Sequence, residues 1–207
     1  MTRRLQRTLR DRRQQRLLNA ARQGDAKALR LLYRELWTPL WRYVAARPLS
    51  HEDAEDLCAQ VFLRFLEKLA DYDPARGAVQ AWLLGIARHA LLDHYRRSRP
   101  DRAQAEPLEA LARHAGDPAP DPLDAMIADE DARLLHGALA GQPADVRELF
   151  ALRYAQGLSH REIAAVTGLS ESAVRQRFSR TLRELRLQGS EDCQPIDTPG
   201  NGEVNHA

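Results

Sequence analysis

Cysteine, lysine, aromatic residues and long apolar runs are all scarce in this chain of 207 residues. Its two cysteines, Cys58 and Cys193, do not form a CxxC pair, so the sequence indicates neither a structural zinc site nor a disulfide framework. Cys58 lies in an apolar helix pattern and is expected in the core, whereas Cys193 stands in a polar tail. No apolar run approaches a membrane span, and the first residues lack the apolar core of a signal peptide. We therefore expect a cytoplasmic protein with no membrane contact, no metal and no cofactor.

The basic residues are almost all arginine, and the charge is unevenly distributed. Lys27 and Lys68 are the only lysines, and the formal net charge is +2. Residues 1–16 hold seven arginines against Asp11, whereas residues 189–207 hold four acidic residues and no Lys or Arg. A basic body with an acidic tail favours a nucleic-acid partner, because the arginine fork pairs with phosphate and with guanine.

Residues 157–180 have the pattern of two helices joined by a tight turn. Ser159 is a good N-cap, and Glu162, three residues later, completes a capping box. Gly168 can adopt the left-handed conformation that ends a helix, and Ser170 can cap the next helix. Together these features predict a helix-turn-helix motif.

The second helix of this motif combines an apolar stripe with an arginine-rich face. Val174, Phe178, Leu182 and Leu185 recur at helical spacing and are expected to be buried. The polar positions between them suit a DNA major groove, because Arg pairs with guanine or phosphate and Gln pairs with adenine. The candidate DNA-contacting residues are Arg175, Gln176, Arg177, Ser179, Arg180 and Arg183.

The first half of the chain contains further amphipathic helices. An early one contains Pro39, which is expected to kink or break it. Another begins with acidic residues at 52–56, which favour the positive end of a helix dipole, and has a wide apolar face. A turn cluster at residues 71–77 follows. The helix over residues 79–99 mixes Arg and His with aromatic residues, a composition that suits an unpaired nucleic-acid strand.

These segments predict an all-α protein with two small helical domains joined by a flexible linker, because no strand pattern occurs. The linker is expected where five prolines fall between residues 100 and 122. The expected divisions are a basic arm at 1–15, a first domain at 16–99, a linker at 100–122, a second domain at 123–188 and a disordered acidic tail at 189–207.

Several stretches resemble domains two and four of bacterial sigma-70 factors. Those similar to domain two are Asp53-Ala54-Glu55-Asp56-Leu57, Val61-Phe62-Leu63-Arg64 and Ala81-Trp82-Leu83-Leu84-Gly85-Ile86-Ala87-Arg88. Those similar to domain four are Leu152-Arg153-Tyr154, Gly157-Leu158-Ser159, Glu162-Ile163-Ala164 and Ser170-Glu171-Ser172-Ala173-Val174-Arg175. Their order and spacing, with no domain between them, resemble the extracytoplasmic-function (ECF) group.

The resemblance implies a protein that binds core RNA polymerase and directs promoter recognition, strand opening and transcription initiation, without being an enzyme. The helix-turn-helix would bind the minus-thirty-five element. The opened minus-ten element would contact Trp82, Arg88, His89, Asp93, Arg96 and Arg97. The clamp of the largest catalytic subunit would contact Asp53, Asp56, Gln60, Phe62 and Arg64. The flap region of polymerase and an anti-sigma factor are further candidate partners.

Two positions depart from the family pattern. His89 stands where many relatives carry Asn, which bears on the base preferred at the minus-ten element. Ala59-Gln60 stands where the family often has Gln-Glu, which removes an acid from the helix that would face the clamp. Residues 189–207 lie outside the resemblance, and their acidity suggests the hypothesis that this tail folds onto the basic helices and inhibits them.

Two alternatives belong to other classes of protein. The first is a one-component helix-turn-helix regulator that acts without core polymerase and whose first domain binds a ligand or dimerises. It would not need the basic helix at 79–99. The second is an enzyme that uses carboxylates and a metal, with candidates Asp53, Asp56, Asp71 and Asp73. Those acids belong to a helix start and a turn, and no Gly-rich phosphate loop or metal-ligand motif accompanies them.

Overall fold

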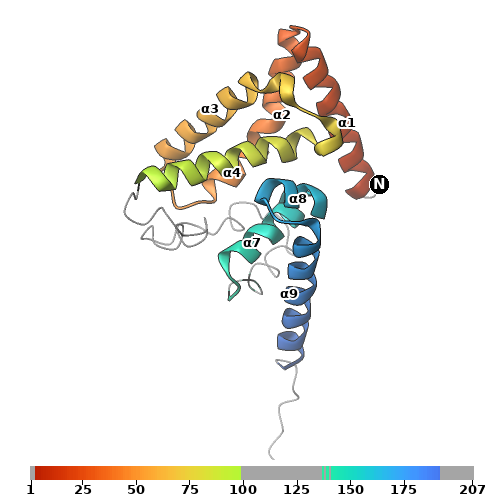
Figure 1. The fold of residues 1–207 in the computed structure, drawn as a ribbon, viewed down its shortest axis with the longest axis vertical. Coiled ribbons are helices and arrows are strands. Elements are labelled where there is room, and N and C mark those ends of the chain that lie inside the picture. The colour runs from red at the N-terminus through yellow and green to blue at the C-terminus, as the bar shows by residue number, and fades with distance from the viewer. Residues whose placement is uncertain (1–2, 99–136, 138, 140, 192–207) are drawn as a thin grey trace, which may run out of the picture.

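The computed structural model describes residues 3–98, 137, 139 and 141–191 (Figure 1). Every regular element within these residues is a helix, which confirms the all-α prediction. The predicted linker at 100–122, the predicted start of the second domain at 123–136 and the tail beyond residue 191 lie outside the described residues.

The first domain contains four long helices. They are α1 (Arg3–Arg22), α2 (Ala26–Ala45), α3 (His51–Glu67) and α4 (Val79–Ser98), with short 3-10 turns at Leu69–Asp71 and Pro74–Arg76. The division expected between a basic arm and this domain at residues 15 and 16 falls inside α1, which is one continuous helix. Leu18 of α1 is fully buried, so α1 is part of the packed domain.

Side-chain caps determine where α2 and α3 begin. The Asp25 carboxylate accepts hydrogen bonds from the backbone N–H groups of Lys27 (2.8 Å) and Ala28 (3.0 Å). The Ser50 hydroxyl accepts one from the N–H of Asp53 (3.0 Å). Each cap satisfies N–H groups that the first helical turn leaves without a partner.

Pro39 does not end α2, which continues to residue 45. The sequence predicted a kink or a break there, and the break does not occur. Leu36 and Leu40, on either side of Pro39, are both fully buried. Their packing offsets the backbone hydrogen bond that proline cannot donate.

The second domain contains α7 (Ala144–Phe150), a π-helical turn (Ala151–Ala155), α8 (His160–Thr167) and α9 (Glu171–Glu191). Phe150 of α7 packs against Phe178 of α9, with ring centroids 4.6 Å apart. The first residues of the predicted acidic tail, 189–191, form the end of α9.

The two domains pack directly against each other, with α8 lying beside α4 (Figure 1). One continuous apolar core includes buried residues of both domains. Across the boundary, buried Gln80 of α4 donates to the side-chain oxygen of Gln156 (2.9 Å), and Gln156 donates to the Pro39 carbonyl (3.2 Å). We call this arrangement the closed conformation.

Candidate nucleic-acid interface

α8 and α9 form the predicted helix-turn-helix. The Ser159 hydroxyl accepts from the Glu162 N–H (3.3 Å) and the Glu162 carboxylate accepts from the Ser159 N–H (2.8 Å), so the capping box is confirmed. Gly168 ends α8 with a φ of 76°, in the left-handed region that favours glycine. The Ser170 hydroxyl accepts from the Ala173 N–H (3.1 Å) and caps α9.

The outer face of α9 carries five of the six candidate DNA-contacting side chains. The exposed ones are Arg175, Gln176, Ser179, Arg180 and Arg183. Val174 and Phe178, on the opposite face, are buried as the stripe predicted. Leu182 and Leu185, the other two residues of the predicted stripe, are only partly buried, whereas Thr181 is buried. The sequence pattern therefore identifies the buried face over the first turns of α9 and overstates its burial further along.

Two of these arginines are paired with acidic residues of the same helix. Arg175 donates to Glu171 (2.5 Å), and the Arg180 guanidinium lies 3.8 Å from Glu184. Exposed pairs at this spacing contribute only about 0.3–0.5 kcal/mol, so a phosphate or a base can replace the glutamate.

Arg177, the sixth candidate, is only partly exposed and has a different partner. Its guanidinium donates to Asp145 of α7 at 2.5 Å. The pair joins two helices through residues that are 32 positions apart along the chain. In this structure Arg177 therefore holds α9 against α7.

His160 lies at the start of α8, next to the helix-turn-helix core. Its ring centroid is 5.0 Å from that of Phe178. Burial, and then the nearby guanidinium groups of Arg153 and Arg175, lower the pKa of His160. This shift favours the neutral form of the side chain, which adds no charge to the arginine face.

On α4, four of the candidate residues for the minus-ten element form one strip. His89, Asp93, Arg96 and Arg97 recur at spacings of three and four and are exposed or half-buried. Asp93 lies 3.8 Å from Arg96 and 3.5 Å from Arg64 of α3. The strip is predominantly basic, and Arg64, predicted as a polymerase contact, lies at its edge.

The other two candidates on α4, Trp82 and Arg88, lie apart from this strip. The Trp82 ring packs 5.0 Å from Phe65 and 5.4 Å from Tyr72, measured between centroids, and is partly buried. The Arg88 guanidinium lies 3.7 Å from Glu148 of the second domain. In the closed conformation neither side chain is freely presented to a DNA strand.

The candidate polymerase contacts on α3 also differ in exposure. Asp53, Asp56 and Gln60 are exposed, whereas Phe62 is buried within an aromatic cluster. Asp53 also accepts a hydrogen bond from the Ser50 hydroxyl (2.6 Å) and so takes part in the helix cap.

Sequence reasoning missed an apolar groove between α2 and α3. The groove has a volume of about 720 Å³, and its lining includes Tyr33, Trp37, Phe62, Leu63 and Leu66. Leu63 is 61% exposed and Leu66 is 42% exposed, which is unusual for leucines so close together. The sequence feature that could have indicated this groove is the wide apolar face of α3. Such a face is too wide to be covered completely by one neighbouring helix.

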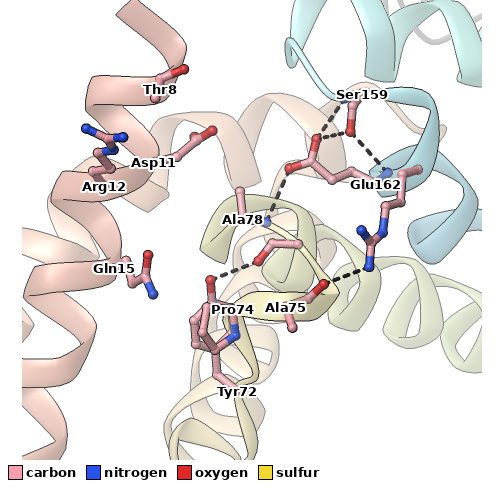
Figure 2. A pocket seen from close by; sticks show the side chains of 12 residues that line it. Thr8, Asp11, Arg12, Gln15, Tyr72, Pro74, Ala75, Ala78, Ser159 and Glu162 are labelled. Carbon is pink, nitrogen blue, oxygen red and sulfur yellow. Dashed lines mark hydrogen bonds between the residues drawn. The ribbon is translucent and has the colours of Figure 1, made fainter.

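A second hollow, of about 310 Å³, lies where α1, the turn at 72–78 and α8 meet (Figure 2). Glu162 of α8 joins all three elements. One carboxylate oxygen accepts from the Ala78 N–H (3.2 Å), and the other accepts from Ser159 and is paired with Arg7 of α1. Burial alone would raise the pKa of Glu162, but the hydrogen bonds from Ser159 and the Arg7 guanidinium outweigh it and lower the pKa.

The turn at residues 71–77 is held from two sides. Arg22, at the end of α1, donates to the carbonyl groups of Leu69 (2.7 Å), Ala70 (2.9 Å) and Tyr72 (2.6 Å). Arg161 of α8 donates to the Ala75 carbonyl (2.8 Å). The turn at residues 71–77 thus lies against the helix-turn-helix.

Among the described residues, no group of three or more His, Cys, Asp or Glu side chains is arranged to hold a metal ion. Within the same residues, no helix is both long enough and apolar enough to cross a membrane.

Comparison with known proteins assigns both domains. Residues 32–100 match the family model described as Sigma-70 region 2, and residues 132–185 match Sigma-70, region 4. The structure of CnrH in complex with the cytosolic domain of CnrY has a similar fold, with a TM-score of 0.56 and 23% identity over 87% of this chain and 99% of that chain.

Curated relatives agree with this assignment. The probable RNA polymerase sigma-C factor of Mycobacterium bovis is 32% identical over 87% of this chain and 91% of its own length. ECF sigma factor BldN of Streptomyces coelicolor is 30% identical, and probable sigma factor RfaY of Xanthomonas campestris is 31% identical. The matches cover 82% and 72% of this chain but only 63% and 36% of those two relatives. The match of the first domain to region 2 does not support the one-component regulator, and the chain belongs to the ECF group of the sigma-70 family.

Proposed function

We propose that this chain binds core RNA polymerase in the cytoplasm and directs it to promoters, without performing a reaction of its own. The observation that carries the proposal is that each family-matched domain exposes a separate basic helix face. One face is the strip on α4 and the other is the outer face of α9. Two such faces in one chain suit two separate elements of one promoter.

The exposed face of α9 would contact the minus-thirty-five element as a duplex. Arg175, Gln176 and Arg180 are exposed at the positions where a recognition helix meets base edges. Their weak pairs with acidic residues of α9 support this role, because binding to DNA would cost little in lost ion pairs.

The strip on α4 would contact the minus-ten element as a single strand. His89 shares this strip with Arg96 and Arg97, so an unstacked base could lie on the imidazole while its backbone contacts the arginines. Trp82, Arg88 and the turn at 71–77 would join this surface once the second domain moves away from the first.

The apolar groove between α2 and α3 would dock on core polymerase. Arg30 and Arg34 also line this groove, so it suits a helical partner with an apolar face and acidic flanks. On the same helix, α3, the proposed contacts with core polymerase also include Asp53, Asp56 and Gln60. The clamp, the flap region and an anti-sigma factor remain predicted partners.

Transcription in vitro tests the proposal. Core polymerase with this protein should initiate at discrete sites on genomic DNA from its source, and core polymerase alone should not. Mapping these start sites would give the two promoter elements. A chain that binds duplex DNA but neither associates with core polymerase nor restores initiation would contradict the proposed function.

A further inference from the structure

A buried carboxylate of the second domain, Glu148, contacts three groups of the first domain. One oxygen accepts hydrogen bonds from the Tyr43 hydroxyl (2.6 Å) and from the Arg47 guanidinium (2.8 Å). The other oxygen lies 3.7 Å from the Arg88 guanidinium. The side chain of Glu148 is 8% exposed and that of Arg47 is 10% exposed, so water screens these charges weakly.

Within the first domain, Arg47 and Tyr43 also contact each other, which fixes the position of the Arg47 guanidinium. Arg47 donates to the Tyr43 carbonyl (2.8 Å), and its guanidinium lies 4.1 Å from the centroid of the Tyr43 ring. Burial, and then the Glu148 carboxylate, raise the pKa of Tyr43, so its hydroxyl stays a hydrogen-bond donor. If the second domain moved away, the guanidinium groups of Arg47 and Arg88 and the Tyr43 hydroxyl would lose their contact with Glu148.

Such a set of groups also suits a phosphate. A backbone phosphodiester carries one negative charge on two non-bridging oxygens, as a carboxylate does, so the guanidinium forks and the hydroxyl that bind Glu148 can also bind a phosphate. Arg88 precedes His89 but lies on a neighbouring face of α4, so the set is on the same helix as the basic strip where single-stranded DNA is proposed to lie. An unpaired strand along α4 would place a phosphate within reach.

We propose that Tyr43, Arg47 and Arg88 form a binding site for a backbone phosphate of single-stranded DNA, which Glu148 occupies in the closed conformation. This inference rests on the proposed function, because it extends the surface assigned to the minus-ten strand. Closure and strand binding then exclude each other, since both need the same cations. The free chain is therefore held in a state with low affinity for DNA.

A second carboxylate of the second domain, that of Glu162, also favours the closed conformation. Glu162 accepts from the Ala78 N–H, directly before α4 begins at Val79. Two acids of the second domain thus cover two anion-binding positions along α4. Glu162 also caps α8, so Glu148 is the residue whose substitution isolates the effect of closure.

The experiment uses the full chain and needs no polymerase. Fluorescence anisotropy measures binding of a labelled mixed-sequence single-stranded oligodeoxynucleotide to wild type and to Glu148→Gln. Energy transfer between dyes on Thr38→Cys of α2 and Leu187→Cys of α9, in a Cys193→Ser background, measures closure. Both labelled positions are exposed.

Glu148→Gln should lower energy transfer and strengthen strand binding about fivefold or more, the range of an ordinary coupling between two sites. Glu67→Gln, an exposed position on α3, removes the same charge and should change neither quantity. Glu148→Asp keeps the charge but withdraws the carboxylate by one methylene, so it should act in the same direction more weakly. Adding Arg47→Gln to Glu148→Gln should remove the gain in strand affinity.

Unchanged strand binding in an opened Glu148→Gln protein would overturn the phosphate site, and unchanged energy transfer would overturn the closing role of Glu148. An equal gain in affinity from Glu67→Gln would overturn the site as well, because net charge would then explain it. Circular dichroism confirms that each variant is folded. Failure of the proposed function would instead appear as absent initiation by wild type with core polymerase, a separate measurement.

Discussion

Arg177 on α9 and Asp145 on α7 form an ion pair of 2.5 Å between two helices of the second domain. Arg175, two residues earlier, is paired with Glu171 of its own helix. Two arginines of similar sequence context therefore have different surroundings. We therefore expect Arg177 to stabilise the second domain and Arg175 to contact DNA.

Arg175→Ala and Arg180→Ala should each weaken binding of duplex minus-thirty-five DNA by about 1–3 kcal/mol and leave stability unchanged. Arg177→Ala should instead lower the free energy of unfolding by about 0.5–1.5 kcal/mol, because it breaks the link to Asp145. Gel-shift titration and urea unfolding measure the two effects. Wild-type stability in Arg177→Ala, combined with lost DNA affinity, would contradict this division of roles.

Stability should depend on the charge of Glu162. Its pKa is lowered in the folded chain, so the carboxylate contributes stability that is present above the ordinary glutamate pKa and is lost as pH falls through the folded value. Glu162→Gln should reduce the free energy of unfolding by about 1–3 kcal/mol at neutral pH. The difference from wild type should shrink as the solution is acidified below the ordinary glutamate pKa.

Urea unfolding at a series of pH values measures this difference. Glu184→Gln serves as the control, because the pair of Glu184 with Arg180 is exposed and lies within α9. A difference between wild type and Glu162→Gln that stays constant from neutral to acidic pH would show that the charge of Glu162 does not matter.

The groove between α2 and α3 should be needed for polymerase binding. Leu63→Ala and Leu66→Ala each remove an exposed apolar contact and should weaken binding of core polymerase about five- to tenfold. Binding to minus-thirty-five DNA should be unchanged. Leu9→Ala is the matched control, because Leu9 of α1 is similarly exposed but lies outside the groove. Equal losses in all three variants would argue against the groove.

Cys58 should be unreactive in the folded chain. It is buried in α3, and burial, followed by the nearby Glu55 carboxylate, raises the pKa of its thiol to about 12. Since the thiolate is the reactive form, iodoacetamide at neutral pH should label Cys58 only after denaturant is added. Mass spectrometry of the labelled peptides measures this, and rapid labelling under native conditions would contradict the packing of α3.

The helix-turn-helix was predictable from the sequence because its determinants are local. Ser159, Glu162 and Gly168 act within one or two helical turns, so their spacing alone specifies the caps. The buried and exposed faces of α9 follow from helical periodicity in the same way. Arg177 shows what local patterns cannot predict. It lies beside exposed arginines, and nothing in the neighbouring sequence indicates its contact with Asp145.

The contacts between the domains could not be predicted from sequence. Tyr43 and Glu148 are 105 residues apart, and neither residue has a local feature that indicates the other. The sequence led us to expect two independent domains, because proline-rich composition between them favours separation. The observed packing depends on matched shapes of α4 and α8, which no periodicity encodes. The groove was missed because an apolar stripe does not reveal which of its leucines stay uncovered.

Glu162 both caps α8 and contacts the first domain, and this restricts the substitutions that the position can accept during evolution. Substituting Glu162 to loosen the domain contact also removes the cap of α8, so drift at this position damages DNA recognition. The side chain of Glu148 takes no part in a helix cap, so its substitution should leave the helix-turn-helix intact. Variation in how readily the protein opens should therefore accumulate at positions 43, 47 and 148 and spare position 162.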